Sequence, residues 1–360
     1  MPFIFPALDS ADATDAGQRV PITVLTGFLG SGKTTLLNRL LRQPDMHGTA
    51  VVINEFGAVG LDHDLVDHTD EQMVLLANGC ICCTVRGDLV EAFERLAQSP
   101  QAQRGELRHV VVETTGLADP APILHTLMGD PRLARQWRLA GVACTIDAFN
   151  AMATLDRHRE AVKQAAVADH LLLTKTDLVA DAMLAPLLER LQGINPLSTV
   201  ARGPDAALQA LVGLLSRPSA ARSSLPADEE RSFFFPVSGP AQHDPSRHDD
   251  QIRSHVIVRE QPLSREGFMA WLDMLSSLRG NDLLRVKGIV QLADDPEHPM
   301  VIHGVQHLFH PPETLARWPS EDRRTRIVFI TRNIDAEDIE ATLSVFERRS
   351  RRDRRPAQPV

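Results

Sequence analysis

Residues 27–34 read GFLGSGKT, which fits the G-x-x-x-x-G-K-[ST] pattern of a phosphate-binding loop. An apolar run, Pro21–Thr26, comes directly before this loop, and a helical pattern over residues 35–41 follows it. Glycines let backbone N–H groups turn onto an anion, and the N-terminus of the following helix adds partial positive charge. The stretch therefore predicts a strand, a loop and a helix that together bind a nucleoside triphosphate.

The residue types in this loop have separate tasks. The Lys33 ammonium would reach the β- and γ-phosphates, and the Thr34 hydroxyl would bind Mg²⁺. A chance glycine-rich turn is the alternative, but the chain has 21 glycines and only four lysines, which makes such a match rare. The other phosphate contacts are expected from Gly27, Gly30, Ser31, Gly32 and Thr35.

Composition sets the class of protein. The chain has 360 residues, enough for two domains, and its net charge of −9 gives no reason to expect nucleic acid. No run approaches the roughly 20 apolar residues of a membrane span, and the N-terminus lacks the basic flank of a signal peptide. Three of the four cysteines stand within four positions, which favours a metal or redox site in a reducing cytosol. We expect a cytoplasmic protein with no membrane or nucleic-acid partner.

The pattern along the chain predicts two domains of different class. Residues 20–215 alternate apolar runs with helical patterns, which indicates an α/β P-loop NTPase domain with a mainly parallel sheet. Residues 251–348 predict a smaller α+β domain with an antiparallel sheet. We expect residues 216–250 to be a linker, 1–19 a flexible tail, and 349–360 a basic, solvated tail.

The expected elements follow from these patterns. Strands are predicted at Val20–Thr26, Ala50–Asn54, His109–Glu113, Val142–Asp147, His170–Thr174 and Ser198–Ala201, then at Ser254–Arg259, Leu284–Leu292, Met300–His307 and Arg326–Thr331. Helices are predicted at Thr34–Arg42, Asp88–Gln98, Pro122–Leu127, Arg157–Ala168, Ala182–Leu191 and Asp205–Leu215, then at Arg265–Leu278 and Ala336–Arg348.

Two further polar groups each follow an apolar strand. At the end of Val110–Val112, Glu113 could hold Mg²⁺ directly or through water, and the backbone N–H of Gly116 could approach a γ-phosphate. Ligands bind at the carboxyl ends of the strands in sheets of this kind. These residues therefore extend the predicted phosphate site.

The second group, Thr174-Lys175-Thr176-Asp177, resembles the guanine-reading sequence N-K-x-D. Asp177 could accept hydrogen bonds from both N1–H and N2–H₂ of guanine, a donor pair that adenine lacks, and the Lys175 stem could lie over the base. Thr174 stands where asparagine is usual, and its hydroxyl supports fewer bonds than a carboxamide. A plain polar turn is the alternative. The group predicts GTP as the nucleotide.

The stretch Asn78–Leu89 contains three closely spaced cysteines. On an extended segment, Cys80 and Cys82 point to one face, and Cys83 can join them if the chain turns. Three thiolates suit Zn²⁺, with a fourth ligand from elsewhere, although Cu(I), Co²⁺ or Ni²⁺ would also bind. Buried structural cysteines and a redox pair are the alternatives. Cys144 lies in an apolar run and is expected in the core.

Taken together, these motifs resemble the CobW-like GTPases, metallochaperones of the SIMIBI class of P-loop proteins. The resemblance implies GTP hydrolysis coupled to delivery of a metal, most often zinc, to a client metalloprotein; some relatives serve cobalt or iron instead. It also implies that Glu55 lies in a first switch, where it could sense the γ-phosphate, Mg²⁺ or the transferred metal. The residues that carry the resemblance are Gly27–Thr35, Asn54–Gly57 with Asp62, Gly79–Leu89, Glu113–Pro120, Thr174–Leu178, Leu284–Gly288, Val301–Gln306 and Asp322–Arg326.

Other readings of the same residues stay open. The chain could be a regulatory module in which the cysteines sense metal or redox state, or an ATP-using kinase-like enzyme, which Lys175 and Asp177 disfavour. It could also form a homodimer that depends on nucleotide or metal. His303, His307 and His310 are read as packing or client contacts rather than a second metal site, because i and i+7 do not share a face of one strand.

Overall fold

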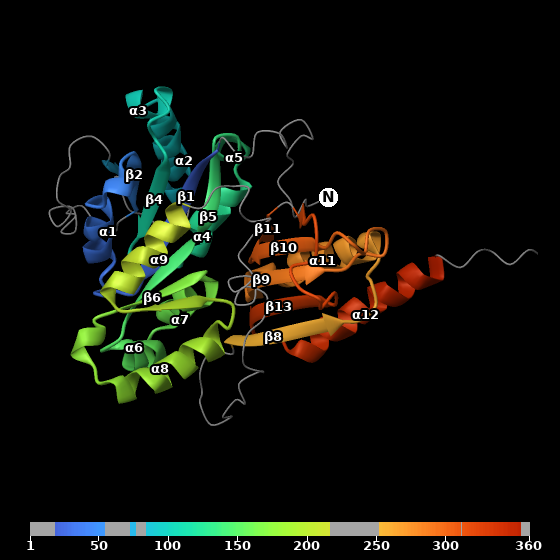
Figure 1. The fold of residues 1–360 in the computed structure, drawn as a ribbon. Coiled ribbons are helices and arrows are strands. Elements are labelled where there is room, and N and C mark those ends of the chain that lie inside the picture. Colours follow the sequence, from blue (N-terminus) through green and yellow to red (C-terminus); the bar gives the residue numbers. More distant parts are fainter. Residues whose placement is uncertain (1–18, 55–72, 77–83, 217–251, 311, 354–360) are drawn as a thin grey trace, which may run out of the picture. The chain divides into compact units, whose positions relative to one another are not determined.

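A computed structural model describes the chain except for residues 1–18, 55–72, 77–83, 217–251, 311 and 354–360 (Figure 1). The chain divides into two compact units, one built on β1 through α9 and the other on β8 through α12.

In the described part of the first unit, seven parallel strands form one sheet in the order β3-β2-β4-β1-β5-β6-β7. The central strands are nearly continuous apolar runs because helices cover both of their faces. All of these strands point the same way, so their carboxyl ends meet at one edge. The strands are β1 (Val20–Gly27), β2 (Thr49–Asn54), β3 (Met73–Leu76), β4 (His109–Thr114), β5 (Trp137–Asp147), β6 (His170–Thr174) and β7 (Thr199–Arg202).

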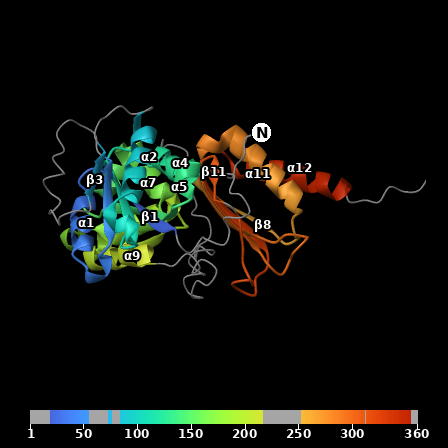
Figure 2. The ribbon, with the colours of Figure 1, turned by 90° about the horizontal axis from the view of Figure 1, so that it is seen from above.

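Helices pack on both faces of this sheet (Figures 1 and 2). On one face, leucines of α1 and α9 form a core with Leu25, Val111 and Leu172 of the strands, and each fully buried leucine contributes ~2 kcal/mol before entropy is counted. On the other face lie α2, α4 and α7. The helices are α1 (Lys33–Leu41), α2 (Thr84–Ala97), α3 (Pro100–Gln103), α4 (Ala121–Gly129), α5 (Pro131–Ala134), α6 (Ala151–Arg157), α7 (Arg159–Val167), α8 (Asp181–Ile194) and α9 (Pro204–Ser216), with single 3₁₀ turns at Pro44–Met46 and Thr176–Leu178.

The second unit is an antiparallel sheet with two helices on one face (Figure 2). Strand order is β11-β10-β9-β13-β8, and β12 pairs with β10. Trp271, Phe268 and Phe329 pack in the layer between the helices and the sheet. The elements are β8 (Ile252–Arg259), α11 (Arg265–Arg279), a 3₁₀ turn (Gly280–Asp282), β9 (Leu283–Val290), β10 (Met300–Val305), β11 (Leu308–Phe309), β12 (Glu313–Thr314), β13 (Thr325–Arg332) and α12 (Ala336–Asp353).

The fold class predicted from the sequence is confirmed in both units, and some element predictions are wrong. The helix expected over Arg157–Ala168 corresponds to α7, which begins at Arg159 because the chain is extended at His158, whereas α6, which ends at Arg157, was not predicted. Strand β5 begins at Trp137 instead of Val142, and β3 was not anticipated. Helix α12 continues to Asp353, beyond the predicted end at Arg348, so the basic tail begins as helix.

Among the described residues, no helix has the length and apolar character needed to cross a lipid bilayer.

Candidate functional site

The loop between β1 and α1 takes its shape from glycines at three positions. Gly27 has φ +142°, and a Cβ there would lie 2.2 Å from the Thr145 hydroxyl. Gly30 and Gly32 have φ +70° and +90°, the left-handed region that other residues rarely adopt. Gly32 also precedes the first turn of α1 and offers no side chain to cap it, so the first helical N–H groups are left for another acceptor. The loop fits a phosphate group.

Lys33 is the first residue of α1, and its charge is held inside the loop. Its Nζ donates to the carbonyl oxygens of Gly27 at 2.9 Å and Phe28 at 3.4 Å, and the side chain is only 9% exposed. The loop therefore places a fixed positive charge next to its own backbone N–H groups.

Thr34, in the first turn of α1, contacts Glu113 near the end of the neighbouring strand β4. The Thr34 hydroxyl donates to Oε1 of Glu113 at 3.0 Å, and Glu113 is buried at 5% exposure. The register of β1 with β4, in which Leu25 is opposite Glu113, brings them together. Both are hard oxygen ligands, and adjacent oxygens around an octahedral ion with bonds of about 2.1 Å are about 3.0 Å apart. The pair fits Mg²⁺.

Gly116, after β4, lies directly against the loop. A Cβ on Gly116 would lie 2.6 Å from the backbone N of Leu29, closer than real Cβ atoms come to other atoms. The segment after β4 and the phosphate loop therefore touch backbone to backbone. This contact brings Gly116 to the same edge as Lys33 and Thr34.

Residues at the end of β6 hold the phosphate loop through hydrogen bonds. The Thr174 hydroxyl donates to the carbonyl oxygen of Ser31 at 2.8 Å, and the carbonyl oxygen of Ile146 lies 3.2 Å from the same hydroxyl. Lys175, in the left-handed conformation, donates to the carbonyl oxygen of Gly30 at 2.8 Å. Thr174 thus supports the loop backbone, a role that its place in the N-K-x-D pattern does not reveal.

Asp147, at the end of β5, orients Lys175. Its Oδ2 accepts from the Lys175 ammonium at 2.8 Å and from the side chain of Asn150 at 2.9 Å. Burial alone would raise the pKa of Asp147, but the hydrogen bonds from Lys175 and Asn150 outweigh burial and leave the pKa below its ordinary value. Sequence reasoning missed this residue, although a carboxylate at the carboxyl end of a predicted strand is a recognisable signal.

Of the other residues predicted to contact the base or the phosphates, Asp177 and Thr35 are exposed and Ser31 is buried. Asp177 lies in the 3₁₀ turn after β6 and is exposed, as is Thr35 on α1. The Ser31 hydroxyl is buried and shares a 2.6 Å hydrogen bond with the Thr145 hydroxyl. Asp177 is therefore free to contact a ligand, whereas Ser31 serves the loop itself.

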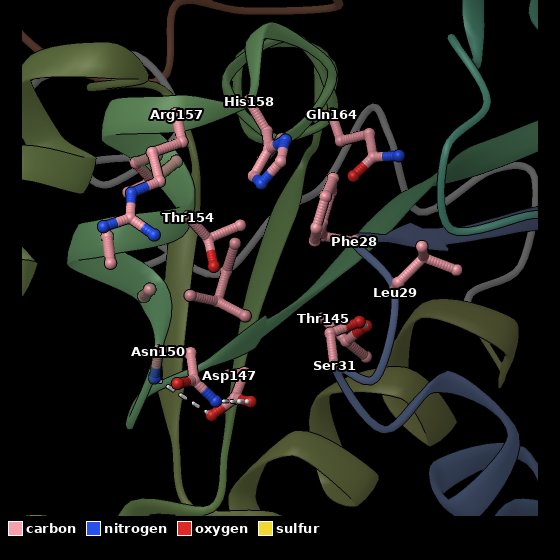
Figure 3. Close-up of a pocket in the computed structure, with 15 residues that line it drawn as sticks. Phe28, Leu29, Ser31, Thr145, Asp147, Asn150, Thr154, Arg157, His158 and Gln164 are labelled. Atoms are coloured by element: carbon pink, nitrogen blue, oxygen red, sulfur yellow. Dashed lines mark hydrogen bonds between the residues drawn. The ribbon is translucent and has the colours of Figure 1, made fainter.

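Behind the loop lies a pocket of about 260 Å³ (Figure 3). Phe28 and Leu29 line one side, and α6 and α7 supply most of the rest. The His158 ring stacks on Phe28 with centroids 4.5 Å apart. The start of α7 thus touches the phosphate loop.

Four predicted site residues lie outside the described residues: Glu55, Cys80, Cys82 and Cys83. The metal site and the first switch therefore remain predictions.

The histidines of the second unit do not follow the predicted strand. The strand expected over Met300–His307 ends at Val305, and the chain turns back through Gln306 at φ 53°. His310 therefore lies beside His303, with ring centroids 6.4 Å apart, and the expectation that i and i+7 would be separated is wrong. No group of three His, Cys, Asp or Glu side chains placed to hold a metal occurs among the residues described.

Cys144 lies in β5 at 1% exposure, and burial raises the pKa of its thiol to about 12. Because the thiolate is the reactive form, we expect Cys144 to resist thiol reagents at pH 8 in the folded protein. The measurement is a colorimetric thiol titration of a variant with Cys80, Cys82 and Cys83 changed to serine. We expect the thiol to react only after unfolding in guanidinium; prompt labelling of the native protein would contradict its burial.

The geometry defines a class of protein: a P-loop nucleotide-binding protein with a parallel sheet, joined to an antiparallel α+β unit. Residues 21–202 match the family described as "CobW/HypB/UreG, nucleotide-binding domain", and residues 252–347 match "Cobalamin synthesis protein cobW C-terminal domain". The chain belongs to the CobW family.

Several characterised proteins are similar over most of the chain. The zinc chaperone YjiA of Escherichia coli is 31% identical over 330 residues, which cover 90% of this chain and 98% of YjiA. The zinc chaperone CobW of Pseudomonas aeruginosa is 28% identical, with 88% of each chain covered. A crystal structure of zinc-bound YjiA GTPase from E. coli matches with a TM-score of 0.66 at 26% identity, over 91% of this chain and 99% of that one.

A eukaryotic relative matches in one region. The zinc-regulated GTPase metalloprotein activator 1 of Schizosaccharomyces pombe is 36% identical over 188 residues, which cover 50% of this chain and 45% of that protein.

Proposed function

We propose that this chain is a cytoplasmic, GTP-hydrolysing metallochaperone that binds zinc at Cys80, Cys82 and Cys83 and passes it to a client metalloprotein. The observation that supports this most is the phosphate loop with the Thr34–Glu113 hydrogen bond, in a chain whose relatives are named zinc chaperones. In this proposal residues 20–215 form the GTPase domain, 216–250 the linker and 251–348 the C-terminal domain.

Hydrolysis at this site would depend on positioning and charge more than on covalent chemistry. Water attacks the γ-phosphorus, the bond to the bridging oxygen breaks, and GDP and phosphate leave. Lys33 and the loop N–H groups stabilise negative charge, and the N–H of Gly116 contacts the γ-phosphate. Thr34 and Glu113 would hold Mg²⁺, which when bound neutralises charge on the β- and γ-phosphate oxygens.

Guanine selection would rest mainly on Asp177. The Asp177 carboxylate is exposed just after β6. The Lys175 ammonium donates hydrogen bonds to Gly30 and Asp147, so only the aliphatic part of this side chain would lie along the base. The Thr174 hydroxyl is bonded to the carbonyl oxygen of Ser31 in the loop, so we assign it to loop support and not to base reading. Relatives named as GTPases support the same nucleotide.

The segment that carries the cysteines follows β3 and precedes helix α2, and β3 ends at the phosphate edge of the sheet. Strand β3 ends at Leu76, four residues before Cys80, and α2 begins at Thr84, so Cys80 lies at most ~14 Å from Leu76. Strand β3 is three positions from β1 in the sheet, a distance of ~14 Å. The two lengths are similar and both strands end at the same edge of the sheet, which supports coupling between the two sites. Glu55 follows β2 at the same edge, where we propose that it senses nucleotide or metal.

Apolar side chains around the same edge offer a surface for the client or for a second copy of the chain. Leu29, Leu117 and Phe149 follow the neighbouring strands β1, β4 and β5 and are 58%, 54% and 60% exposed. Large apolar side chains exposed together commonly mark an interaction surface.

Zinc titration in the presence of different nucleotides tests this function. We expect a non-hydrolysable GTP analogue to change the zinc dissociation constant by about 5–150-fold relative to GDP, the range of typical coupling energies. Because the site is proposed to select guanine, the matching ATP analogue should leave the zinc dissociation constant at its nucleotide-free value. Isothermal titration calorimetry measures the zinc dissociation constant in each state.

Cys82→Ala is the matched control, because it removes one thiolate and leaves the nucleotide site intact. It should weaken zinc binding while GTP affinity stays within about twofold. A zinc affinity that is the same with and without nucleotide would contradict the chaperone proposal. Transfer of zinc to an apo-metalloprotein in the absence of GTP would favour a metal sensor.

A further inference from the structure

Residues of helix α7 contact both ends of the segment 116–119, which follows β4. Gln164 is fully buried, and its Nε2 donates to the carbonyl oxygens of Gly116 at 3.2 Å and Ala118 at 3.0 Å. One residue earlier, the Lys163 ammonium lies 3.3 Å from Oδ2 of Asp119. Asp119 in turn accepts from the backbone N–H of Ala121, where α4 begins. Two consecutive residues of one helix therefore hold residues 116–119.

The orientation of the Gln164 carboxamide follows from its surroundings. Two backbone carbonyls face one end, so the amide nitrogen must lie there, since an oxygen would repel both. The oxygen Oε1 is buried and has no hydrogen-bond partner among the described residues. Figure 3 shows this side chain beside Phe28, at the end of the pocket nearest the loop. Burial of an amide oxygen without a hydrogen-bond partner costs free energy. The two hydrogen bonds that the Gln164 nitrogen donates must offset this cost by holding residues 116 and 118 in place.

The held segment lies against the phosphate loop on its other side. Gly116 touches the backbone of Leu29, and His158 at the start of α7 stacks on Phe28. Helix α7 thus contacts both segments that would surround the γ-phosphate. Neither contact involves the residues that would bind the α- and β-phosphates.

We propose that Gln164 is a positioning residue that sets the distance of the Gly116 backbone from the γ-phosphate and so distinguishes GTP from GDP. This inference rests on the proposed function, since it presumes GTP at the loop. Lys163 supports the far end of the same segment through Asp119. Loss of the Gln164 donors leaves the loop, Lys33 and Thr34 in place, so GDP binding survives while recognition of the third phosphate weakens.

The test compares nucleotide affinities of the wild-type chain with Gln164→Leu, which keeps the volume and removes the donors. We expect GDP affinity within about twofold, binding of a non-hydrolysable GTP analogue weakened by at least about fivefold, and kcat lowered by about tenfold. Fluorescent nucleotide titrations give the affinities, and phosphate release gives kcat. Without nucleotide, hydrogen exchange at the amides of residues 115–119 should quicken in the variant.

Val162→Ala is the matched control, a packing deletion on the same helix that should lower stability without changing the ratio of GTP to GDP affinity. If Gln164→Leu does not fold, Lys163→Ala tests the same segment and should shift the ratio in the same direction, by about two- to fivefold. The positioning role is overturned if the ratio of GTP to GDP affinity in Gln164→Leu equals that of the wild-type chain, or if Val162→Ala changes this ratio by the same amount. A wild-type chain that binds neither nucleotide would overturn the proposed function instead.

Discussion

Replacement of Lys33 by alanine should abolish GTP hydrolysis while the fold persists. The ammonium is held inside the phosphate loop by the carbonyl oxygens of Gly27 and Phe28, where it would oppose charge that grows on the transferring phosphoryl group. Loss of one preorganised group of this kind typically lowers kcat by a factor of 100 to 1,000, and we expect at least about 100-fold. Single-turnover phosphate release measures the effect.

Two companion variants show whether the loss is specific. Arg42→Ala removes one positive charge from the opposite end of α1, at an exposed position, and should change turnover by less than about twofold. Lys33→Arg keeps the charge but not the shape of the buried side chain, and should also be inactive. The free energy of unfolding of Lys33→Ala should stay within about 1 kcal/mol of wild type, as measured by denaturant titration. Turnover above half of wild type in Lys33→Ala would refute the phosphate assignment.

The central part of the fold was predictable because its signals are local. The glycines of residues 27–32 and the apolar runs beside them define strand, loop and helix without reference to the rest of the chain. Strand β6 was predicted at its observed bounds, His170–Thr174, for the same reason. Alternation of such runs then implied a parallel sheet, and with it the edge at which Thr34, Glu113 and Gly116 meet.

Elements with weak local signals were missed or misplaced. Strand β3, Met73–Leu76, has four residues and follows a polar stretch, so no period can be read from it. The start of β5 includes Gly141, which a strand pattern does not favour and which lies where a Cβ would come within 2.9 Å of the Leu214 side chain. Helix α6, Ala151–Arg157, was also missed, because its seven residues are fewer than the roughly 11–18 over which a helical period is read.

The site beyond its motifs depends on contacts between distant segments. Thr174 bonds to Ser31, Lys175 to Gly30, and Gln164 to Gly116, and these partners are 143, 145 and 48 residues apart. A single sequence holds no trace of such pairs. Motifs therefore predict which residues would contact the ligand, but not which residues hold the motifs in place.

Gly116→Ala should disrupt nucleotide binding more broadly than the Gln164 variant. The added Cβ would meet the backbone N and Cα of Leu29 at 2.6 and 2.7 Å, so either the phosphate loop or the segment after β4 must move. A shift of the loop disturbs the N–H groups that would hold every phosphate. We therefore expect GDP and GTP affinities both to fall by about tenfold or more, and the free energy of unfolding to fall by about 1–3 kcal/mol, as overpacking usually causes. Fluorescent nucleotide titration and denaturant unfolding measure the two effects.

Gly213→Ala supplies the control for the added methyl group. Gly213 is an exposed residue of α9 with open space where its Cβ would be, so alanine there should leave binding unchanged and raise the free energy of unfolding by up to about 1 kcal/mol. The comparison separates the effect of contact with Leu29 from that of a glycine-to-alanine change on the unfolded chain. If Gly116→Ala bound GDP as tightly as wild type, the two segments would tolerate separation, and the close backbone approach would have no part in holding the nucleotide.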